Sequence, residues 1–302
     1  MKNGVSTLTN VSRATRTLGA ILVDSGQLKP DDAERVLHHQ KQHNLRFGES
    51  AMRLGLISEA DLQYALSRQF AYAYLRKMPG DARTLSDELV AAYQPFSPRV
   101  EQLRAIRSQL MLRWFDRAED RQVLTIIGAE RSEGRSYLAA NLAIVFSQLG
   151  ERTLLVDADM REPRQHFLFY LENQIGFSTL LAGRSREEAI VRIPDLAGLS
   201  VLPAGPTPPN PLELLNRLNF DEFLIQAKNA YDVIIVDTPA MSTGEDAAMI
   251  AVRTGAALAL ARSGATHVAS FNDMVRGLMD AGVSVVGSVL NEVPLTKKKS
   301  GK

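Results

Sequence analysis

Residues 122–138 read QVLTIIGAERSEGRSYL, and this stretch decides how the rest of the chain is interpreted. The apolar run at 123–127 predicts a buried β-strand, and a helical pattern opens by Leu138. Between them lies Gly134-Arg135-Ser136, where a phosphate-binding loop of the form G-x-x-x-x-G-K-[ST] has glycine, lysine and a hydroxyl residue. The second glycine and the serine are present, whereas the first glycine and the lysine are not. Taken alone, this loop indicates a nucleotide site only weakly.

Two further apolar runs end in carboxylates. Residues 153–159 read TLLVDAD, and residues 231–239 read YDVIIVDTP. Each run predicts a strand buried on both faces, because aliphatic residues continue without alternation. Parallel strands bring such terminal carboxylates to one edge of a sheet, beside the crevice where ligands bind. Asp157, Asp159 and Asp237, together with the glycine loop, therefore favour a site for phosphate and Mg²⁺ over three unrelated loop caps.

The order of the predicted elements indicates a doubly wound, mostly parallel α/β sheet. A helix at 100–114 leads into the strand at 122–127, and a helix at 136–149 follows the glycine loop. Strands and helices that alternate along the chain are typical of a parallel sheet with helices on both faces. Further strands are expected at 199–202, 256–261 and 284–290.

Composition excludes several classes of protein. The chain has 302 residues, beyond the size at which one hydrophobic core usually suffices, so two domains are expected. The net charge of +1 gives no reason to expect nucleic acid as a partner. The absence of cysteine excludes disulfides and cysteine-ligated zinc. Because residues 1–14 are polar and no long apolar run exists, we expect a cytoplasmic protein, and any link to a membrane would come through a partner or a surface patch.

Four segments match signatures that occur together in one family. LLVDADMREP at 154–163 is similar to a second Walker motif, and YDVIIVDTP at 231–239 to a Walker B motif. PTPPNPLELL at 206–215 resembles a further signature, and EQLRAIRSQL at 101–110 contains the pattern E-x-x-R-x-x-R. Together they resemble the bacterial tyrosine kinases (BY-kinases) of exopolysaccharide systems over residues 97–294. Within that family, the resemblance is greatest to the subgroup that accompanies chain-length-determinant proteins.

The resemblance implies ATP and Mg²⁺ as cofactors, and phosphoryl transfer to tyrosine, which depends on positioning and charge neutralisation. Ser136, Asp159 and Asp237 would hold Mg²⁺ directly or through water. Asp157 would orient the attacking tyrosine hydroxyl, although the three aspartates can exchange roles. The nucleotide would lie against Ser132, Glu133, Gly134, Arg135, Ser136 and Tyr137. Self-association into rings would use Glu101, Arg104 and Arg107.

Two departures from the family pattern bear on activity. Arg135 stands in place of the loop lysine, and Arg131-Ser132 replaces a common Pro-Gly; arginine is planar and bidentate where lysine is a compact point charge. The family usually ends in a tyrosine cluster, but the last tyrosine here is Tyr231. Either another protein or an upstream tyrosine is then the substrate, or kinase activity has been lost. The upstream candidates are Tyr72, Tyr74 and Tyr93.

Residues 15–75 contain an internal repeat with an offset of 29 residues. Leu18-Gly19 and Gly26 recur as Phe47-Gly48 and Gly55. Each copy predicts a short helix, a turn closed by glycine, and a second helix. A small helical domain that buries its Leu and Ala faces accounts for this pattern without a ligand.

The repeat also resembles the N-terminal domain of type II secretion and type IV pilus ATPases, in which two tandem copies can bind cyclic di-GMP. Residues 1–80 carry eleven Lys and Arg against seven Asp and Glu, a local charge of +4 that suits a ligand with two phosphates. Glycines in the repeat would let the ligand approach the backbone closely. The residues expected to bind it are Arg16, Gly19, Gly26, Gln40, Arg46, Gly48, Gly55 and Gln69.

These observations and resemblances predict a protein-tyrosine kinase that controls exopolysaccharide chain length, polymerisation and export with a membrane chain-length-determinant partner, and cyclic di-GMP is its expected regulator. One alternative is a degenerate scaffold that binds both nucleotides without phosphorylating anything. The other is a partitioning ATPase of the ParA/MinD type, against which the helix at 101–110 and the PPNPLELL segment argue. The expected segments are a disordered N-terminus (1–14), the repeat domain (15–75), a linker that packs a helical turn or two on the kinase domain (76–98), the kinase-like domain (99–294) and a basic tail (295–302).

Overall fold

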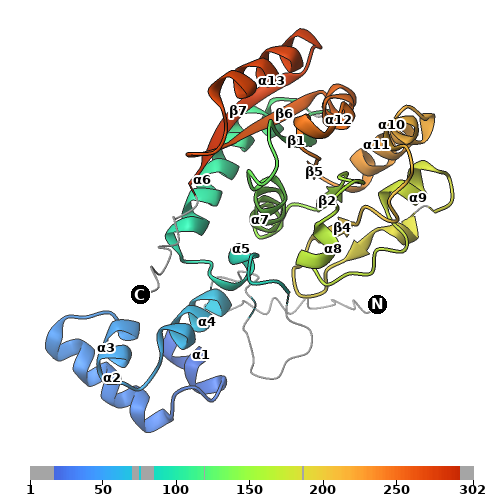
Figure 1. The fold of residues 1–302 in the computed structure, drawn as a ribbon. Helices are drawn as coiled ribbons and strands as arrows, with labels where there is room; N and C mark the ends of the chain where they lie inside the picture. Colours follow the sequence, from blue (N-terminus) through green and yellow to red (C-terminus); the bar gives the residue numbers. More distant parts are fainter. Residues whose placement is uncertain (1–16, 70–74, 76–84, 119, 186, 293–302) are drawn as a thin grey trace, which may run out of the picture. The chain divides into compact units, whose positions relative to one another are not determined.

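The computed structural model describes residues 17–69, 75, 85–118, 120–185 and 187–292, and the chain forms two compact units, residues 1–76 and 77–302 (Figure 1). No helix in the described parts of the chain combines the length and apolar character needed to cross a bilayer. Several predictions concern positions outside the described residues, namely the expected disordered N-terminus, Arg16, Tyr72, Tyr74 and the basic tail.

The second unit is built on a seven-stranded sheet in the order β3-β4-β2-β5-β1-β6-β7 (Figure 1). Neighbouring strands are parallel except β3 and β4, which pair antiparallel at one edge. The predicted doubly wound, mostly parallel α/β fold is confirmed, and only the short edge strand β3 was not predicted. The strands are β1 (Val123–Gly128), β2 (Thr153–Asp157), β3 (Val191–Arg192), β4 (Leu199–Leu202), β5 (Val233–Asp237), β6 (Ala256–Arg262) and β7 (Ser284–Asn291).

Helices cover both faces of this sheet. One face packs against α9 to α13 through two hydrophobic clusters, and the other is covered by α7, with α5 and α6 packed on α7. Every residue of β1, β2 and β5 is buried, which explains their unbroken apolar runs. The helices are α5 (Val90–Tyr93), α6 (Pro98–Arg113), α7 (Arg135–Ser147), α8 (Gln165–Leu168), α9 (Phe177–Leu181), α10 (Pro211–Leu215), α11 (Leu218–Ala230), α12 (Asp246–Thr254) and α13 (Val268–Asp280), with 3₁₀ turns at Phe115–Arg117, Glu187–Ala189 and Met241–Thr243.

The part of the predicted linker that is described packs on α7 through a buried amide. The Ala91 N–H donates to Asn141 Oδ1 at 2.9 Å, and Asn141 Nδ2 donates to the Glu88 carbonyl at 2.9 Å. Leu89, and with it all of α5, is buried. The segment is therefore fixed to the helix that begins at the glycine loop, and its one helical turn agrees with the prediction of a turn or two.

The first unit contains four short helices at the predicted offset. They form two helix-turn-helix copies, and the first helix of each copy ends before a glycine with positive φ, Gly26 at 71° and Gly55 at 66°. Glycine is favoured at such a helix end because other residues are strained there. The helices are α1 (Leu18–Asp24), α2 (Pro30–His43), α3 (Phe47–Arg53) and α4 (Glu59–Gln69).

Two glycines of the repeat serve packing within this unit. A Cβ on Gly48 would lie 2.4 Å from Leu62 Cδ1, and a Cβ on Gly19 would lie 3.0 Å from the ring of Phe47. Packing within the unit therefore accounts for these two glycines without a ligand, and their contact with cyclic di-GMP stays a prediction. Arg46, by contrast, is exposed.

Candidate nucleotide site

The loop between β1 and α7 has the backbone that the glycine motif predicts. Gly134, with φ 99°, immediately precedes α7, which begins at Arg135, one residue earlier than expected. Ser132 also has a positive φ, 61°, in the region that favours glycine. The loop therefore adopts this turn although Arg131-Ser132 replaces the usual Pro-Gly, at a strain of about 1 kcal/mol.

Side chains from the far end of the sequence hold the loop from the β6–β7 side. Arg262 Nη1 donates to the Ser132 carbonyl at 3.1 Å, and Asn291 Nδ2 donates to the Glu133 carbonyl at 2.8 Å. Thr266 Oγ1 donates to the Glu133 carboxylate. Sequence reasoning missed these three contacts, because nothing in the local pattern connects residues more than a hundred positions apart.

Arg135 is anchored inside the loop. Its side chain is buried, Nη1 donates to the Glu130 carbonyl at 2.6 Å, and Nε donates to the Thr238 carbonyl at 3.1 Å. Nη1 also lies 3.4 Å from the carboxylate of Glu133, which is 1% exposed. The guanidinium thus joins the loop to the end of β5, where the sequence predicted a cation directed at phosphate.

The predicted carboxylates meet at the ends of β2 and β5, where Asp157 lies directly beside Asp237 in the parallel register. Asp157 accepts hydrogen bonds from the backbone N–H groups of Arg164 at 2.9 Å and Gln165 at 2.8 Å. Gln165 Nε2 donates to Asp237 Oδ2 at 2.8 Å and to the Ser136 carbonyl at 3.1 Å. Gln165 therefore links both acidic strand ends to α7, a role the sequence did not reveal.

Burial makes these carboxylates costly to ionise. Burial raises the pKa of Asp237 to about 6, although the Gln165 amide and the Ser136 hydroxyl lower it in part. Burial, followed by the neighbouring Asp237, raises the pKa of Asp157 well above its usual range, and burial also raises the pKa of Asp159. Buried acidic groups that lack a cation are typical of a site that receives one.

The same groups fit a bound Mg²⁺. Asp237 Oδ1 is buried and has no hydrogen-bond partner, so one carboxylate oxygen is available to a metal ion or to its water. Asp159 lines the adjoining cavity, as does Ser136. Within the described residues no group of three or more His, Cys, Asp or Glu side chains is arranged to hold a metal ion by itself.

A cavity of about 510 Å³ opens onto the loop and the strand ends. Four arginines border it, and each forms an ion pair: Arg131 with Glu162, Arg135 with Glu133, Arg161 with Asp246 and Arg164 with Glu88. Asp157 and Asp237 are both fully buried behind this cavity and do not border it, so among the three aspartates Asp159 alone lines it. The full lining is Arg131, Ser132, Gly134, Arg135, Ser136, Asp159, Arg161, Glu162, Arg164, Pro239, Ala240 and Thr243.

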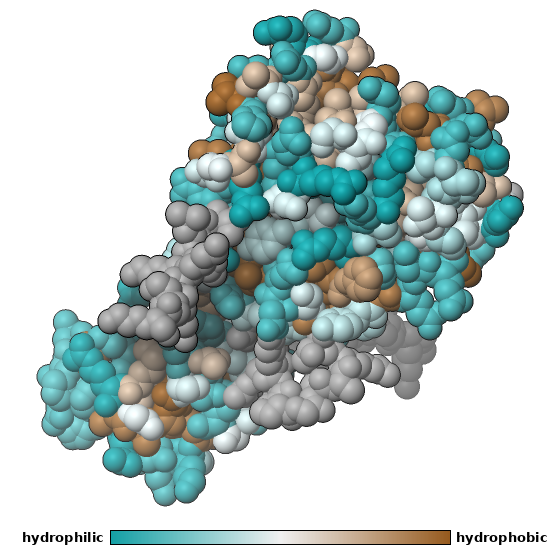
Figure 2. Space-filling view, in the orientation of Figure 1, coloured by the Kyte–Doolittle hydropathy of each residue, from teal (hydrophilic) through white to brown (hydrophobic). Residues whose placement is uncertain are grey.

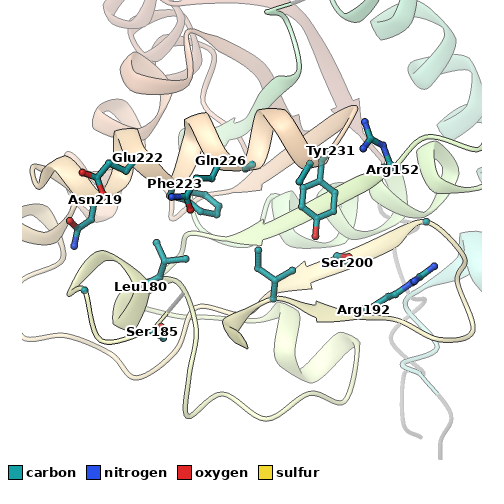
Figure 3. A pocket seen from close by; sticks show the side chains of 15 residues that line it. Arg152, Leu180, Ser185, Arg192, Ser200, Asn219, Glu222, Phe223, Gln226 and Tyr231 are labelled. Atoms are coloured by element: carbon teal, nitrogen blue, oxygen red, sulfur yellow. The ribbon is translucent and has the colours of Figure 1, made fainter. Parts of the chain in front are cut away.

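A second cavity of about 710 Å³ lies elsewhere, between α9, α11 and the sheet edge formed by β3 and β4. Figure 3 shows Leu180 and Phe223 pointing toward each other across it, with Tyr231 directed into it. Neither the glycine loop nor the buried carboxylates line this cavity. The smaller cavity is therefore the candidate nucleotide site, because it joins the loop, the helix start and acidic strand ends.

The residues of the predicted ring helix make contacts within the chain. Arg104 forms an ion pair with Glu101, whose side chain is 63% exposed. Arg107 Nη1 donates to the Val145 carbonyl of α7 at 2.6 Å. Arg107 therefore holds α6 on α7. Among the three residues predicted to form the ring contact, Glu101 is the one whose side chain is mostly exposed.

Tyr93 is corrected as a candidate phosphorylation target. Its ring is buried, and its hydroxyl donates to the Leu85 carbonyl at 2.8 Å. Phosphorylation there would require α5 to leave α7. Tyr137, which borders the loop in sequence, is half-buried, and burial raises its pKa.

The fold and the site define a P-loop-type nucleotide-binding protein, with a glycine turn, a helix start and acidic strand ends at one edge of a parallel sheet. No protein-family model matches the chain. The putative tyrosine-protein kinase CapB of Staphylococcus aureus is 37% identical over 209 residues, which are 68% of this chain and 90% of CapB. The chain belongs to the bacterial protein-tyrosine kinase family.

Solved structures agree with this assignment. The kinase domain of the Escherichia coli tyrosine kinase ETK is 31% identical, covers 75% of this chain and 88% of its own, and superposes with a TM-score of 0.67. The septum site-determining protein MinD of Pyrococcus horikoshii, solved with Mg-ADP, has a TM-score of 0.50 at 21% identity over 56% of this chain and 70% of MinD. The likeness to MinD shows the shared fold alone.

Proposed function

We propose that the protein is an ATP-dependent protein-tyrosine kinase that regulates exopolysaccharide chain length, polymerisation and export. The observation that carries this is the buried, partnerless Asp237 Oδ1 beside Ser136 at the glycine turn, in a chain of the tyrosine kinase family. ATP phosphates would lie on the N–H groups at the start of α7, which favour anions. Mg²⁺ bound to Asp237 and Ser136 would neutralise charge on the phosphates, which leaves Asp159 free of the metal.

Other residues of the chain would accept the tyrosine proton, fix the loop and bind the phosphorylated product. Asp159 borders the cavity, so it can accept the proton of an incoming tyrosine hydroxyl, while Asp157 behind it fixes the loop through backbone N–H groups. Arg161 and Arg164 line the cavity beside their paired carboxylates, where guanidinium N–H groups can bind a phosphorylated product. Gln165 keeps both strand ends in register with α7.

The partner and location follow from the family resemblance. A membrane chain-length-determinant protein would hold this kinase at the inner membrane from the cytoplasmic side. Ring assembly would use the exposed end of α6. Binding of cyclic di-GMP to the first unit remains a prediction that rests on the repeat, the local charge of +4 and the exposed Arg46.

Ring assembly is testable at Glu101, because this side chain is exposed while Arg107 also serves the monomer. Glu101→Arg should shift the sedimentation distribution toward smaller species at a concentration where the parent chain assembles. Like charges at a subunit contact repel, and three-residue spacing on one helix face keeps the new charge beside Arg104. The matched control is Gln109→Arg on the same helix, also exposed. A distribution that responds equally to both variants would remove α6 as a specific contact.

One observation favours the alternative of a nucleotide-binding scaffold. Arg135 uses its guanidinium on the Glu130 and Thr238 carbonyls, so it supplies fewer free donors to phosphate than a loop lysine would. A scaffold of this kind would bind Mg-ATP and partner without transferring phosphate.

The deciding experiment incubates the full chain with Mg-ATP, the cytoplasmic segment of the partner and a synthetic Glu-Tyr copolymer, followed by phosphotyrosine mapping. Transfer to any tyrosine that requires Mg²⁺ is the expected result. Tight Mg-ATP binding by calorimetry, with no phosphotyrosine on chain, partner or copolymer, would instead establish the scaffold.

A further inference from the structure

The chain has seven tyrosines, and exposure to solvent separates those that the structure describes. Tyr170, which follows α8, is 71% exposed. Tyr93 is buried, and Tyr64, Tyr137 and Tyr231 are half-buried. Among the tyrosines in the described parts of the chain, Tyr170 alone presents most of its ring to solvent, where another protein can reach the hydroxyl.

The backbone at Tyr170 is unusual for an aromatic residue. Its φ is 50°, in the left-handed region that glycine and asparagine adopt at low cost. An exposed turn gains nothing from a bulky side chain in that conformation, and strained surface positions often mark functional sites. The positive φ and the exposed ring together make Tyr170 a candidate for a role other than folding.

The position of Tyr170 relates it to the nucleotide site of another copy. It lies five residues after Gln165, whose backbone and amide contact Asp157 and Asp237. Those contacts fix the start of this segment, and Tyr170 does not border the cavity of its own chain. An encounter of its hydroxyl with a nucleotide site would therefore take place in the cavity of a second molecule.

We propose that Tyr170 is the phosphoryl acceptor of this protein, phosphorylated by a second copy; this rests on the proposed kinase function. The Tyr170 oxygen attacks the γ-phosphorus of Mg-bound ATP and forms an O–P bond. The bond from that phosphorus to the β,γ-bridging oxygen breaks, and ADP leaves with the electron pair. The phenolic proton passes to Asp159 of the molecule that binds ATP, which lines the cavity.

The surroundings of Tyr170 suit such an encounter. Phe167 is 66% exposed and Ile175 is 47% exposed on the same segment, so a second copy would cover apolar area on docking. On the face that Figure 2 presents, hydrophilic residues predominate and hydrophobic ones are scattered. A small apolar contact fits a transient complex that releases its product. The arginine-bordered mouth of the receiving cavity then favours the new phosphate.

The test uses the full chain and separates donor from acceptor. Asp237→Asn, which lacks the proposed Mg²⁺ ligand, serves as an acceptor that cannot phosphorylate itself, and unaltered chain serves as donor. With Mg-ATP, mass spectrometry should find phosphate on Tyr170 of the acceptor. The double variant Asp237→Asn, Tyr170→Phe should lose most of this signal, whereas Asp237→Asn, Tyr64→Phe should keep it. Tyr170→Asn should retain or raise the melting temperature, because asparagine suits the positive φ.

Phosphorylation of the Glu-Tyr copolymer by the same donor distinguishes two failures. If the copolymer is phosphorylated and Tyr170 is not, Tyr170 is not the acceptor while the kinase function stands. If neither is phosphorylated, the kinase function fails and the acceptor fails with it. Phosphate on Tyr170 only within the donor molecules, never on the acceptor, would overturn transfer between copies. A lower melting temperature for Tyr170→Asn would mean that the Tyr170 ring stabilises the fold, and its positive φ would then not indicate a functional site.

Discussion

Asp237→Asn should stabilise the ligand-free protein at pH 8 while abolishing the Mg²⁺ dependence of ATP binding. Asp237 is fully buried beside Asp157, and burial raises its pKa from 3.8 to about 6. A shift of this size corresponds to about 3 kcal/mol of unfavourable ionisation, of which a variant recovers about 1–3 kcal/mol. Asparagine still accepts the hydrogen bond from Gln165 but offers Mg²⁺ no charge.

The stabilisation expected from Asp237→Asn depends on pH, because Asp237 ionises at a higher pH in the folded protein than in the unfolded chain. Because the folded-state pKa of Asp237 is raised, the folded protein binds a proton that the unfolded chain has already released between pH 4 and about pH 6. The free energy of unfolding therefore decreases as pH rises through this window and levels off above it. The gain from Asp237→Asn should be small near pH 4 and largest above pH 6. Mg²⁺ binding, which needs the carboxylate ionised, should strengthen over the same interval.

Urea unfolding across this pH range, with calorimetry of ATP binding with and without Mg²⁺, measures both effects. Asp232→Asn is the matched control, since Asp232 lies at the solvent and Arg152 lowers its pKa. That control should leave Mg²⁺ dependence intact and gain no stability at pH 8. Equal Mg²⁺ dependence of ATP binding in the parent and in Asp237→Asn would place the metal elsewhere. A lower free energy of unfolding for Asp237→Asn than for the parent would mean that the folded protein already stabilises the ionised Asp237 carboxylate.

The sequence predicted the sheet and its acidic edge because both are local signals. Each central strand is buried on both faces, so its residues are apolar without interruption, and each carboxylate follows its strand directly. The edge strand β3 has two exposed residues and carries no such signal. A glycine indicates either a close ligand or a close neighbouring side chain: the sequence predicts that Gly48 contacts a ligand, and the structure places Leu62 where its Cβ would lie.

What the sequence missed depends on partners far apart in the chain. Gln165 is an ordinary polar residue until the fold brings it to Asp237, and Asn291 reaches the Glu133 carbonyl across 158 positions. The same holds for Arg135, whose charge suggested a phosphate contact while the fold supplies it with carbonyl partners. Side-chain orientation at a loop is set by such distant acceptors, and no local spacing reports them.

Arg135→Ala should cost the protein both stability and nucleotide affinity. The guanidinium holds the Glu130 and Thr238 carbonyls and lies beside the buried Glu133 carboxylate. Removing one partner from a buried charged pair costs about 3–5 kcal/mol, and the carbonyls lose their donors too. Because the loop must hold its turn to present N–H groups to phosphate, ATP affinity should fall by about tenfold or more. Differential scanning fluorimetry and calorimetry measure the two losses.

Arg135→Lys separates anchoring from phosphate binding. Lysine provides the charge from a compact, flexible ammonium but cannot hold two carbonyls with a planar fork. It should therefore lose part of the stability that arginine gives, yet retain or raise phosphoryl transfer, since its ammonium can turn toward the phosphates. Arg131→Ala is the control. Arg131 borders the same cavity, but its side chain is exposed, so its removal should change the melting temperature little.

Adding Glu133→Gln to Arg135→Ala decides why stability falls. If the loss comes from the uncompensated Glu133 carboxylate, the neutral amide should restore much of the melting temperature, because no charge then remains buried. ATP affinity should stay low in this double variant, since the loop still lacks its anchor to Glu130 and Thr238. Unchanged affinity in Arg135→Ala would mean that the β6–β7 contacts from Arg262, Thr266 and Asn291 hold the loop by themselves. Arginine at this position would then contribute to the fold and leave phosphate binding to the backbone.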